Sequence, residues 1–192
     1  MRRRSVMMRV LSGITLTVGG LLLACAGPPT ATDDRSADVM ALNSLSEAAT
    51  VAQFTATDVS TGLVDPGVVE VQGLHVLVRG VVGAARITST DPRLTGDALQ
   101  TVNGQLLVAD GSGRVWGKLE DHVDAGGVWE GSWEGQTEAT GPGQWVITMK
   151  LVARGRGGAI DGLLFRAEET AYQNAFLGPH FGQVTGTILQ PH

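Results

Sequence analysis

Regularly spaced glycine-rich turns are the feature that most restricts the fold of this chain. They occupy residues 110–113, 124–127, 141–143 and 155–158, with centres about 15 residues apart. Gly, Asp and Pro favour tight turns, and a segment of this length suits one strand of about 9 to 11 residues. No stretch of about twelve residues in this region has a convincing helical period. The spacing therefore predicts an antiparallel meander of strands.

Between these turns, the odd-numbered positions are apolar or Gly. They are Val115, Gly117, Leu119, Trp129, Gly131, Trp133, Gly135, Trp145, Ile147, Met149, Leu151, Ala153, Leu163, Phe165 and Ala167. This alternation predicts strands with one buried and one exposed face. None of these positions is ionisable, so the buried face is expected to carry no titratable group.

The alternation also suggests how neighbouring strands pair. Trp133 is expected opposite Leu119 on one side and opposite Leu151 on the other, which builds one continuous apolar face. On the outer face, the same pairing forms a charge ladder of Lys118, Glu134 and Lys150. A slip of one residue in either pair would turn Trp133 towards these charges.

Long meander strands with one buried face must cover or close their edges. An up-and-down barrel of about eight strands does so economically, and a two-sheet sandwich is the alternative. Branched residues at 68–71, 74–78 and 106–108 supply earlier strands, so the β domain is expected to span residues 51–192. Gly beside Trp over residues 129–135 suits a strongly curved wall, because the ring covers the bare backbone.

The N-terminal segment has a different composition. Residues 1–24 contain four Arg and no acidic residue, and an apolar run fills residues 10–24. Fifteen residues at about 1.5 Å each reach ~22 Å, which is short of the ~30 Å hydrocarbon core. Residues 1–24 are therefore expected to be a secretory signal peptide. Residues 3–7 also resemble the twin-arginine export pattern, so both this route and the general one stay open.

Leu22-Leu23-Ala24-Cys25 closes the apolar run and resembles the lipobox of bacterial lipoproteins. In that family the signal peptide is cut before the Cys, whose thiol receives a diacylglyceryl group, and the new amino group often receives a fatty acid such as palmitate. The resemblance implies cleavage between Ala24 and Cys25 and anchoring on the extracytoplasmic side of a bacterial membrane. An ordinary secretory peptide with an incidental Cys is the alternative. The Pro-rich and polar start of residues 25–50 predicts a flexible tether.

The charges are divided unevenly along the chain. The whole sequence has a net charge of −5, whereas residues 25–192 hold 10 Lys and Arg against 19 Asp and Glu, a net charge of −9. An acidic domain argues against a nucleic-acid partner. The expected partners are membrane lipid through the anchor, and either a small apolar ligand or a protein of the cell envelope.

A second resemblance concerns the β domain. The run from Trp129 through Trp145 to residues 157–163, ending in residues 186–188, is similar to the calycin-type barrels of the allene-oxide-cyclase and dirigent group. It covers about 75 of the 192 residues and consists of turn and packing motifs. The resemblance implies a calycin-like barrel. It transfers no catalytic residue, because no active-site motif matches.

The polar residues form no recognisable catalytic or metal motif. Ser132 lacks the glycines of a nucleophile elbow, and residues 155–158 lack the Lys of a phosphate-binding loop. The four histidines lack a second ligand at a useful spacing, so neither a metal nor a cofactor is expected; they are His75, His122, His180 and His192. Glu130, Glu134 and Glu138 share one strand face, which is either a solvated outer surface or a calcium-binding one.

The apolar face combines large rings with missing side chains. Trp129, Trp133, Trp145, Met149 and Phe165 are expected to line an interior cavity, in which Gly117, Gly131 and Gly135 leave space. Eight-stranded barrels of this kind hold small ligands. The absence of ionisable residues beside the rings favours a binding protein over an enzyme. A small barrel cyclase or isomerase and a purely structural envelope lipoprotein are the alternatives.

Overall fold

A computed structural model describes residues 49–191, which fold into nine strands and two short 3-10 turns. The strands are β1 (Ala49–Asp65), β2 (Val68–Gln72), β3 (His75–Ser89), β4 (Gly96–Leu107), β5 (Gly113–Val123), β6 (Val128–Gly141), β7 (Gln144–Arg156), β8 (Leu164–Gln173) and β9 (His180–Gln190). The 3-10 turns are η1 (Pro92–Leu94) and η2 (Gly158–Ile160). Within residues 49–191, no helix is long and apolar enough to cross a membrane.

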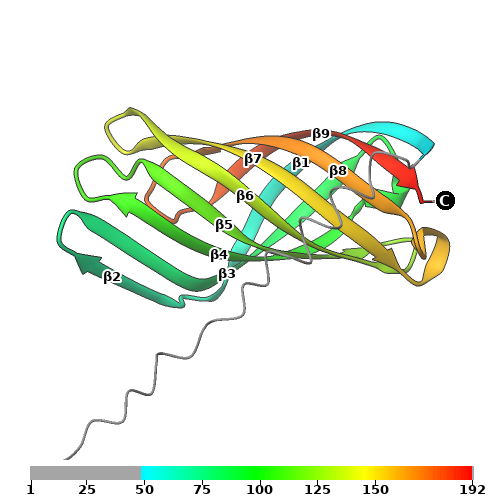
Figure 1. The fold of residues 1–192 in the computed structure, drawn as a ribbon, viewed down its shortest axis with the longest axis horizontal. Coiled ribbons are helices and arrows are strands. Elements are labelled where there is room, and N and C mark those ends of the chain that lie inside the picture. Colours follow the sequence, from blue (N-terminus) through cyan, green and yellow to red (C-terminus); the bar gives the residue numbers. More distant parts are fainter. Residues whose placement is uncertain (1–48, 192) are drawn as a thin grey trace, which may run out of the picture. The chain divides into compact units, whose positions relative to one another are not determined.

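The strands close into an up-and-down antiparallel barrel (Figure 1). Consecutive strands from β3 to β9 pair in order, β9 pairs with β1, and β1 pairs with β3 to complete a ring of eight strands. The short strand β2 pairs with β3 outside this ring. The predicted barrel is thus confirmed and the two-sheet alternative is wrong. Ala49 and Thr50, which the sequence assigned to the tether, belong to β1.

One of the two predicted strand registers is confirmed. Across β6 and β7, Trp133 lies opposite Leu151 and Glu134 lies opposite Lys150. Across β5 and β6 the prediction is wrong by two residues, because Trp133 lies opposite Gly117 rather than Leu119. A shift of two residues keeps every side chain on its expected face.

The shifted register breaks the predicted charge ladder. Lys118 lies opposite Ser132, and Glu134 forms its ion pair with Arg114 at 2.9 Å instead. A ring placed over a glycine explains the shift. A Cβ atom on Gly117 would stand 1.6 Å from the Thr101 carbonyl oxygen and 2.9 Å from the Trp133 ring. Gly117 therefore lets the wall curve under the indole.

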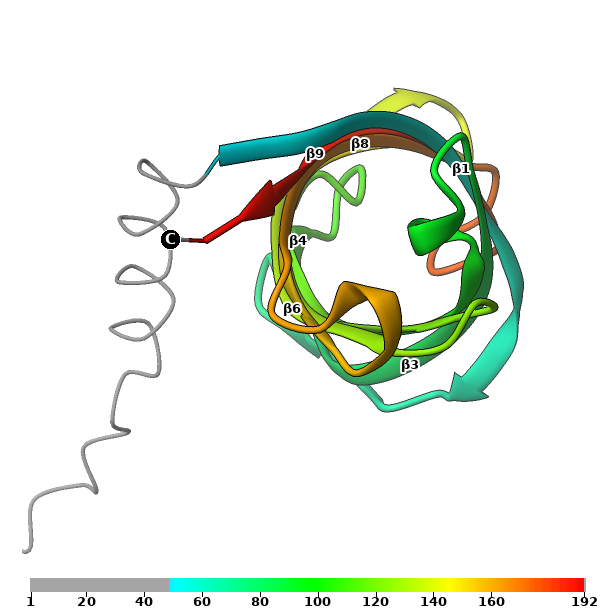
Figure 2. The same ribbon diagram turned by 90° about the vertical axis from the view of Figure 1, so that its right-hand side faces the viewer.

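One end of the barrel is closed. The loops that carry η1 and η2 cross the bore at this end, as the view along the barrel shows (Figure 2). Leu94 of η1 and Ile160 of η2 are buried there. Trp129 is fully buried against Phe165, with ring centroids 5.1 Å apart, and its Nε1 donates a hydrogen bond to the Arg93 carbonyl at 2.7 Å. This half of the interior is a packed core.

The other end carries the turns between β4 and β5 and between β6 and β7, the β8–β9 loop, and the β2–β3 hairpin. Register shifts interrupt β1 between Ser60 and Gly62 and again between Leu63 and Asp65, and Gly80 lies in a shift of β3. Bulges of this kind splay a barrel rim. All five residues of β2 are exposed, and three of them are valines.

Candidate functional site

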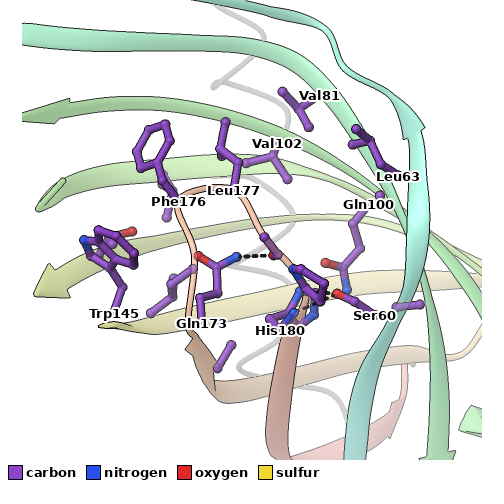
Figure 3. Close-up of a pocket in the computed structure, with 18 of the residues that line it drawn as sticks. Ser60, Leu63, Val81, Gln100, Val102, Trp145, Gln173, Phe176, Leu177 and His180 are labelled. Carbon is purple, nitrogen blue, oxygen red and sulfur yellow. Dashed lines mark hydrogen bonds between the residues drawn. The ribbon is translucent and has the colours of Figure 1, made fainter. Parts of the chain in front are cut away.

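A cavity of about 230 Å³ lies inside the open half of the barrel (Figure 3). Most of its wall is apolar, and the lining includes Leu63, Val81, Val102, Ile147, Met149 and Ala171. The polar side chains Ser60, Gln100 and His180 lie together on the right of Figure 3 and face the same space. An apolar chamber with a few convergent polar groups is the usual design of a small-molecule site.

The β8–β9 loop covers part of the cavity mouth. Phe176, Leu177 and Pro179 of this loop line the cavity, and the Gln173 side chain donates a hydrogen bond to the Gly178 carbonyl at 3.1 Å. Leu177 has a φ of +52°, the only positive φ of a non-glycine residue among those described. A bulky residue in the left-handed backbone conformation is strained, and such strain commonly marks loops that move or clamp a ligand.

Aromatic rings form the outer edge of the mouth. Trp145 packs edge-on against Phe176, with centroids 6.2 Å apart, and donates through Nε1 to the Asp110 carbonyl at 2.7 Å. Gly111 is required beneath this ring, because a Cβ atom there would stand 2.7 Å from the Trp145 Nε1. The mouth is therefore built from the start of β7, the β8–β9 loop and the backbone of the β4–β5 turn.

A chain of polar contacts forms the floor of the cavity. The Ser60 Oγ lies 2.8 Å from the His180 Nδ1 and accepts a hydrogen bond from the His180 backbone N–H at 3.0 Å. The His180 Nε2 faces the Asp58 Oδ2 at 3.3 Å. Gln100 donates through Nε2 to the same carboxylate oxygen at 2.6 Å. Asp58 is completely buried, so this floor carries an acidic group deep inside the barrel.

Two more carboxyl groups lie beneath the floor. Asp58, Asp121 and Glu169 all line a second cavity of about 30 Å³ on the closed side. Burial, reinforced by the Asp58 carboxylate, raises the pKa of Glu169 to about 8. Burial also raises the pKa of Asp121 to about 7, with Asp58 adding to the shift and His122 opposing it. At neutral pH, Glu169 therefore keeps its proton in most molecules.

Several buried polar atoms around the two cavities have no hydrogen-bond partner. They are Asp58 Oδ1, Asp121 Oδ1, Glu169 Oε1, His180 Nε2, Trp133 Nε1 and Thr137 Oγ1. An unsatisfied buried polar atom costs about 1–3 kcal/mol. Donors and acceptors gathered around an enclosed space are therefore poised to bind a polar atom.

The structure divides the five residues that the sequence grouped around one cavity. Trp133, Trp145 and Met149 line the cavity of the open half. Trp129 and Phe165 lie in the closed core instead, because η1 and η2 seal that end. Gly117, Gly131 and Gly135 do not leave the space expected of them. Their positions are filled by neighbouring backbone, with Cβ distances to carbonyl oxygens of 1.6, 2.1 and 2.3 Å.

The expectation of an interior without titratable groups is wrong. Asp121 and Glu169 continue the odd-numbered apolar faces of β5 and β8 by one step beyond Leu119 and Ala167. If the alternating pattern had been extended by two residues beyond Leu119 and beyond Ala167, it would have predicted that Asp121 and Glu169 face inwards. Asp58 and His180 gave no such signal, because they are 122 positions apart in the sequence and become neighbours only when β9 pairs with β1.

The remaining candidates from the sequence lie outside this site. Glu130 and Glu134 are on the outer surface, where they pair with Arg156 and Arg114, and Glu138 is exposed on the same strand. His122 is also exposed, beside Glu120. Ala24, Cys25 and His192 lie outside the described residues.

Comparison of this chain with protein-family models, with curated protein sequences and with solved structures finds no match.

Proposed function

We propose that this chain is a bacterial lipoprotein, anchored through Cys25 on the extracytoplasmic side of a membrane, whose barrel binds a small molecule in the cavity of its open half. The observation that supports ligand binding is the chamber itself, which has apolar walls and the polar groups of Ser60, Gln100 and His180 at its inner end. The ligand should have an apolar body and one hydrogen-bonding group.

The size of the cavity restricts the ligand. A volume of about 230 Å³ falls below the roughly 300–1,000 Å³ of pockets for drug-sized compounds. A compact ligand, such as a short-chain or single-ring compound, suits this volume better than a phospholipid. The Trp145 and Phe176 rings at the mouth supply an apolar contact for its outer end.

Native mass spectrometry and tryptophan fluorescence test ligand binding. The full chain should release a small molecule on denaturation, or its fluorescence should respond to one member of a panel of apolar and amphipathic compounds. Val102→Phe fills the cavity and should abolish binding, whereas Val59→Phe, at an exposed position outside the cavity, should not. If the protein retains no compound and its fluorescence responds to none of the panel, the ligand-binding proposal is contradicted.

The anchor has its own test. Wild-type protein should fractionate with membranes and incorporate labelled fatty acid, and Cys25→Ser should be released into the soluble fraction of the envelope. A Cys25→Ser variant that stays membrane-bound and labelled would overturn the anchoring part of the proposal and leave the ligand-binding part standing.

A barrel enzyme of the cyclase or isomerase type is the second candidate. The observation that favours it is the presence of Glu169 and His180 inside the barrel, because protonatable groups beside an enclosed ligand can transfer protons. If the protein is an enzyme, Glu169→Gln should retain a bound compound that differs chemically from the one the wild type releases. Identical compounds in both proteins would favour simple binding.

An envelope partner is favoured by a different observation. Val68, Val69, Val71 and Leu74 of the β2–β3 hairpin are between 47% and 78% exposed. Exposed apolar residues on an edge strand are a common protein-interaction surface. A photo-crosslinker at Val71 should capture a partner in cells if this hairpin docks one, and a crosslinker at Glu138 on the outer wall serves as the control.

A further inference from the structure

Three side chains of the types that bind metal ions meet at and just beneath the floor of the cavity. Asp58 comes from β1, Glu169 from β8 and His180 from the start of β9. One candidate ligand atom from each residue lies within 4.8 Å of those of the other two. Because β9 separates β1 from β8 in the sheet, these side chains meet across the concave inner face of the barrel wall.

Each of these three residues has a buried side-chain atom that lacks a hydrogen-bond partner. Asp58 is completely buried and Glu169 is 3% exposed. Asp58 Oδ1, Glu169 Oε1 and His180 Nε2 make no hydrogen bond, although Nε2 lies 3.3 Å from the other Asp58 oxygen. Leaving three such atoms unsatisfied is costly, and a cation bound among these side chains would offset part of that cost.

Neighbouring residues hold two of the three ligands in position. The Gln100 amide donates to the Asp58 Oδ2 at 2.6 Å, which leaves Oδ1 free. The Ser60 hydroxyl contacts the His180 Nδ1 at 2.8 Å, which leaves Nε2 free. Metal-binding histidines and carboxylates are normally oriented by outer contacts of this kind.

A glycine makes room for the third ligand. Gly182 of β9 lies opposite Asp58 in the strand pairing, and the Glu169 carboxyl group occupies the space of its missing side chain. A Cβ atom on Gly182 would stand 2.1 Å from the Glu169 Oε1 and 3.2 Å from the Asp58 Cβ. Without this glycine, the Glu169 carboxyl could not take its present place beside Asp58.

The charge around the cluster is also unbalanced. No Lys or Arg is among the described residues that line either interior cavity. Two buried carboxyl groups with one imidazole therefore have no cationic side chain nearby. A divalent cation would displace the Glu169 proton and then compensate the negative charge of the two carboxylates in a region of low dielectric constant.

We propose that Asp58, Glu169 and His180 bind one divalent transition-metal ion, with Zn²⁺ as the best fit, beside the ligand cavity that His180 lines. One imidazole nitrogen and two carboxylate oxygens form a donor set that Zn²⁺ accepts. Three protein ligands with one free position are typical of zinc sites that act on a bound molecule. Ligand distances of about 2.0–2.2 Å require the three side chains to rotate inwards by a small amount. This inference does not depend on the anchor or on the ligand proposed above.

Calorimetry on the full chain, purified in detergent and stripped with a chelator, tests the site with Zn²⁺. We expect one equivalent of Zn²⁺ to bind, and Co²⁺ to give the visible absorption of a low-symmetry, four- or five-coordinate ion. Glu169→Gln and His180→Gln should each weaken Zn²⁺ binding by about 100-fold or more, and Ser60→Ala by about 10-fold. The matched surface variants Glu130→Gln and His122→Gln should bind like the wild type.

X-ray absorption spectroscopy of the wild-type Zn²⁺ complex identifies the ligand atoms directly, so it tests the site even if a variant fails to fold. One imidazole and two or more oxygen neighbours, with no sulfur, are the expected coordination shell. Sulfur in the shell would assign the ion to Cys25, and several imidazoles would assign it to surface histidines. Either of these coordination shells would overturn the proposal. Zn²⁺ binding that persists in Glu169→Gln and His180→Gln, or the absence of Zn²⁺ binding by the wild type, would also overturn it.

Discussion

The two halves of the barrel interior are built from the same alternating strands and differ in almost every other respect. In the closed half, Trp129 is fully buried, its Nε1 is hydrogen-bonded, and Phe165 packs against it. In the open half, the Trp133 Nε1 has no partner and the rings surround a cavity. A layer of polar side chains, Asp58, Gln100, Asp121 and Glu169, lies between them around the smaller cavity. In this barrel, the apolar strand face is packed core only in the half whose end is closed by η1 and η2.

The largest expected effect is the loss of a ring from the closed half. Trp129→Ala should lower the free energy of unfolding by about 3–5 kcal/mol, because a large buried side chain leaves a cavity and the Arg93 carbonyl loses its donor. Trp145→Ala at the open mouth should cost clearly less, since this ring is only partly buried. Urea unfolding of both variants measures the two costs. Equal costs would mean that the mouth is as tightly packed as the core.

The pH dependence of stability tests the layer between the halves. The pKa of Asp121 is about 7 and that of Glu169 about 8 in the folded chain, against about 4 for each in water. Between these values the folded state binds protons that the unfolded chain has released. For the chelator-stripped chain, the free energy of unfolding should therefore fall as pH rises from about 4 to about 8, by roughly 4 kcal/mol for each group at most.

Substitution assigns this pH dependence to named residues. Asp121→Asn and Glu169→Gln should each flatten the curve of unfolding free energy between pH 4.5 and 8, as measured by urea unfolding at several pH values. Glu138→Gln, on the exposed outer wall, should leave the curve unchanged and is the matched control. A wild-type stability that rises over this range would contradict the assignment.

A smaller effect should distinguish the wall from the rim. A methyl group on Gly117 would collide with the Thr101 carbonyl oxygen and the Trp133 ring, whereas a methyl group on Gly62 at the rim would meet nothing within 4 Å. Gly117→Ala should therefore cost about 1–3 kcal/mol, and Gly62→Ala should be nearly neutral. Thermal unfolding of the pair reports the difference. A neutral Gly117→Ala would show that the ring does not need the bare backbone.

The smallest expected effect is at an unpartnered hydroxyl in the open half. Thr137 lines the cavity, and its Oγ1 is buried without a hydrogen-bond partner. Thr137→Val keeps the shape and removes the unsatisfied group, so stability should be unchanged or should rise by up to about 1 kcal/mol. Chemical denaturation measures the change. A loss of more than about 1 kcal/mol would show that the hydroxyl is satisfied, for example by a ligand atom.

Much of the fold could be predicted from local patterns. The turns around Gly111, Gly126 and Gly143 fall where the spacing placed them, and the odd-numbered faces of β5 to β8 point inwards. The register of β5 against β6 was missed by two residues, because both choices bury the same face. Only the folded barrel shows that the Trp133 ring lies over Gly117.

The candidate site was harder to predict. The sequence placed Trp133, Trp145 and Met149 on one face, and these do line the cavity. It grouped Trp129 and Phe165 with them, because alternation shows which face of a strand a residue occupies. It does not show how much of the barrel interior the loops carrying η1 and η2 close. Ser60 and Gln100 were not identified at all, since an isolated polar residue in a strand has no local signature.

The strand alternation and the turns, and therefore an all-β meander, follow from local sequence, since they depend on a two-residue period and on the backbone preferences of Gly, Asp and Pro. Three other features depend on contacts between distant segments of the chain: β1 closes the ring against β3 and β9, η1 and η2 seal one end, and Asp58, Glu169 and His180 meet. Such contacts leave no local pattern in the sequence. Alternation acts between neighbouring residues, whereas closure of the barrel joins residues more than one hundred positions apart.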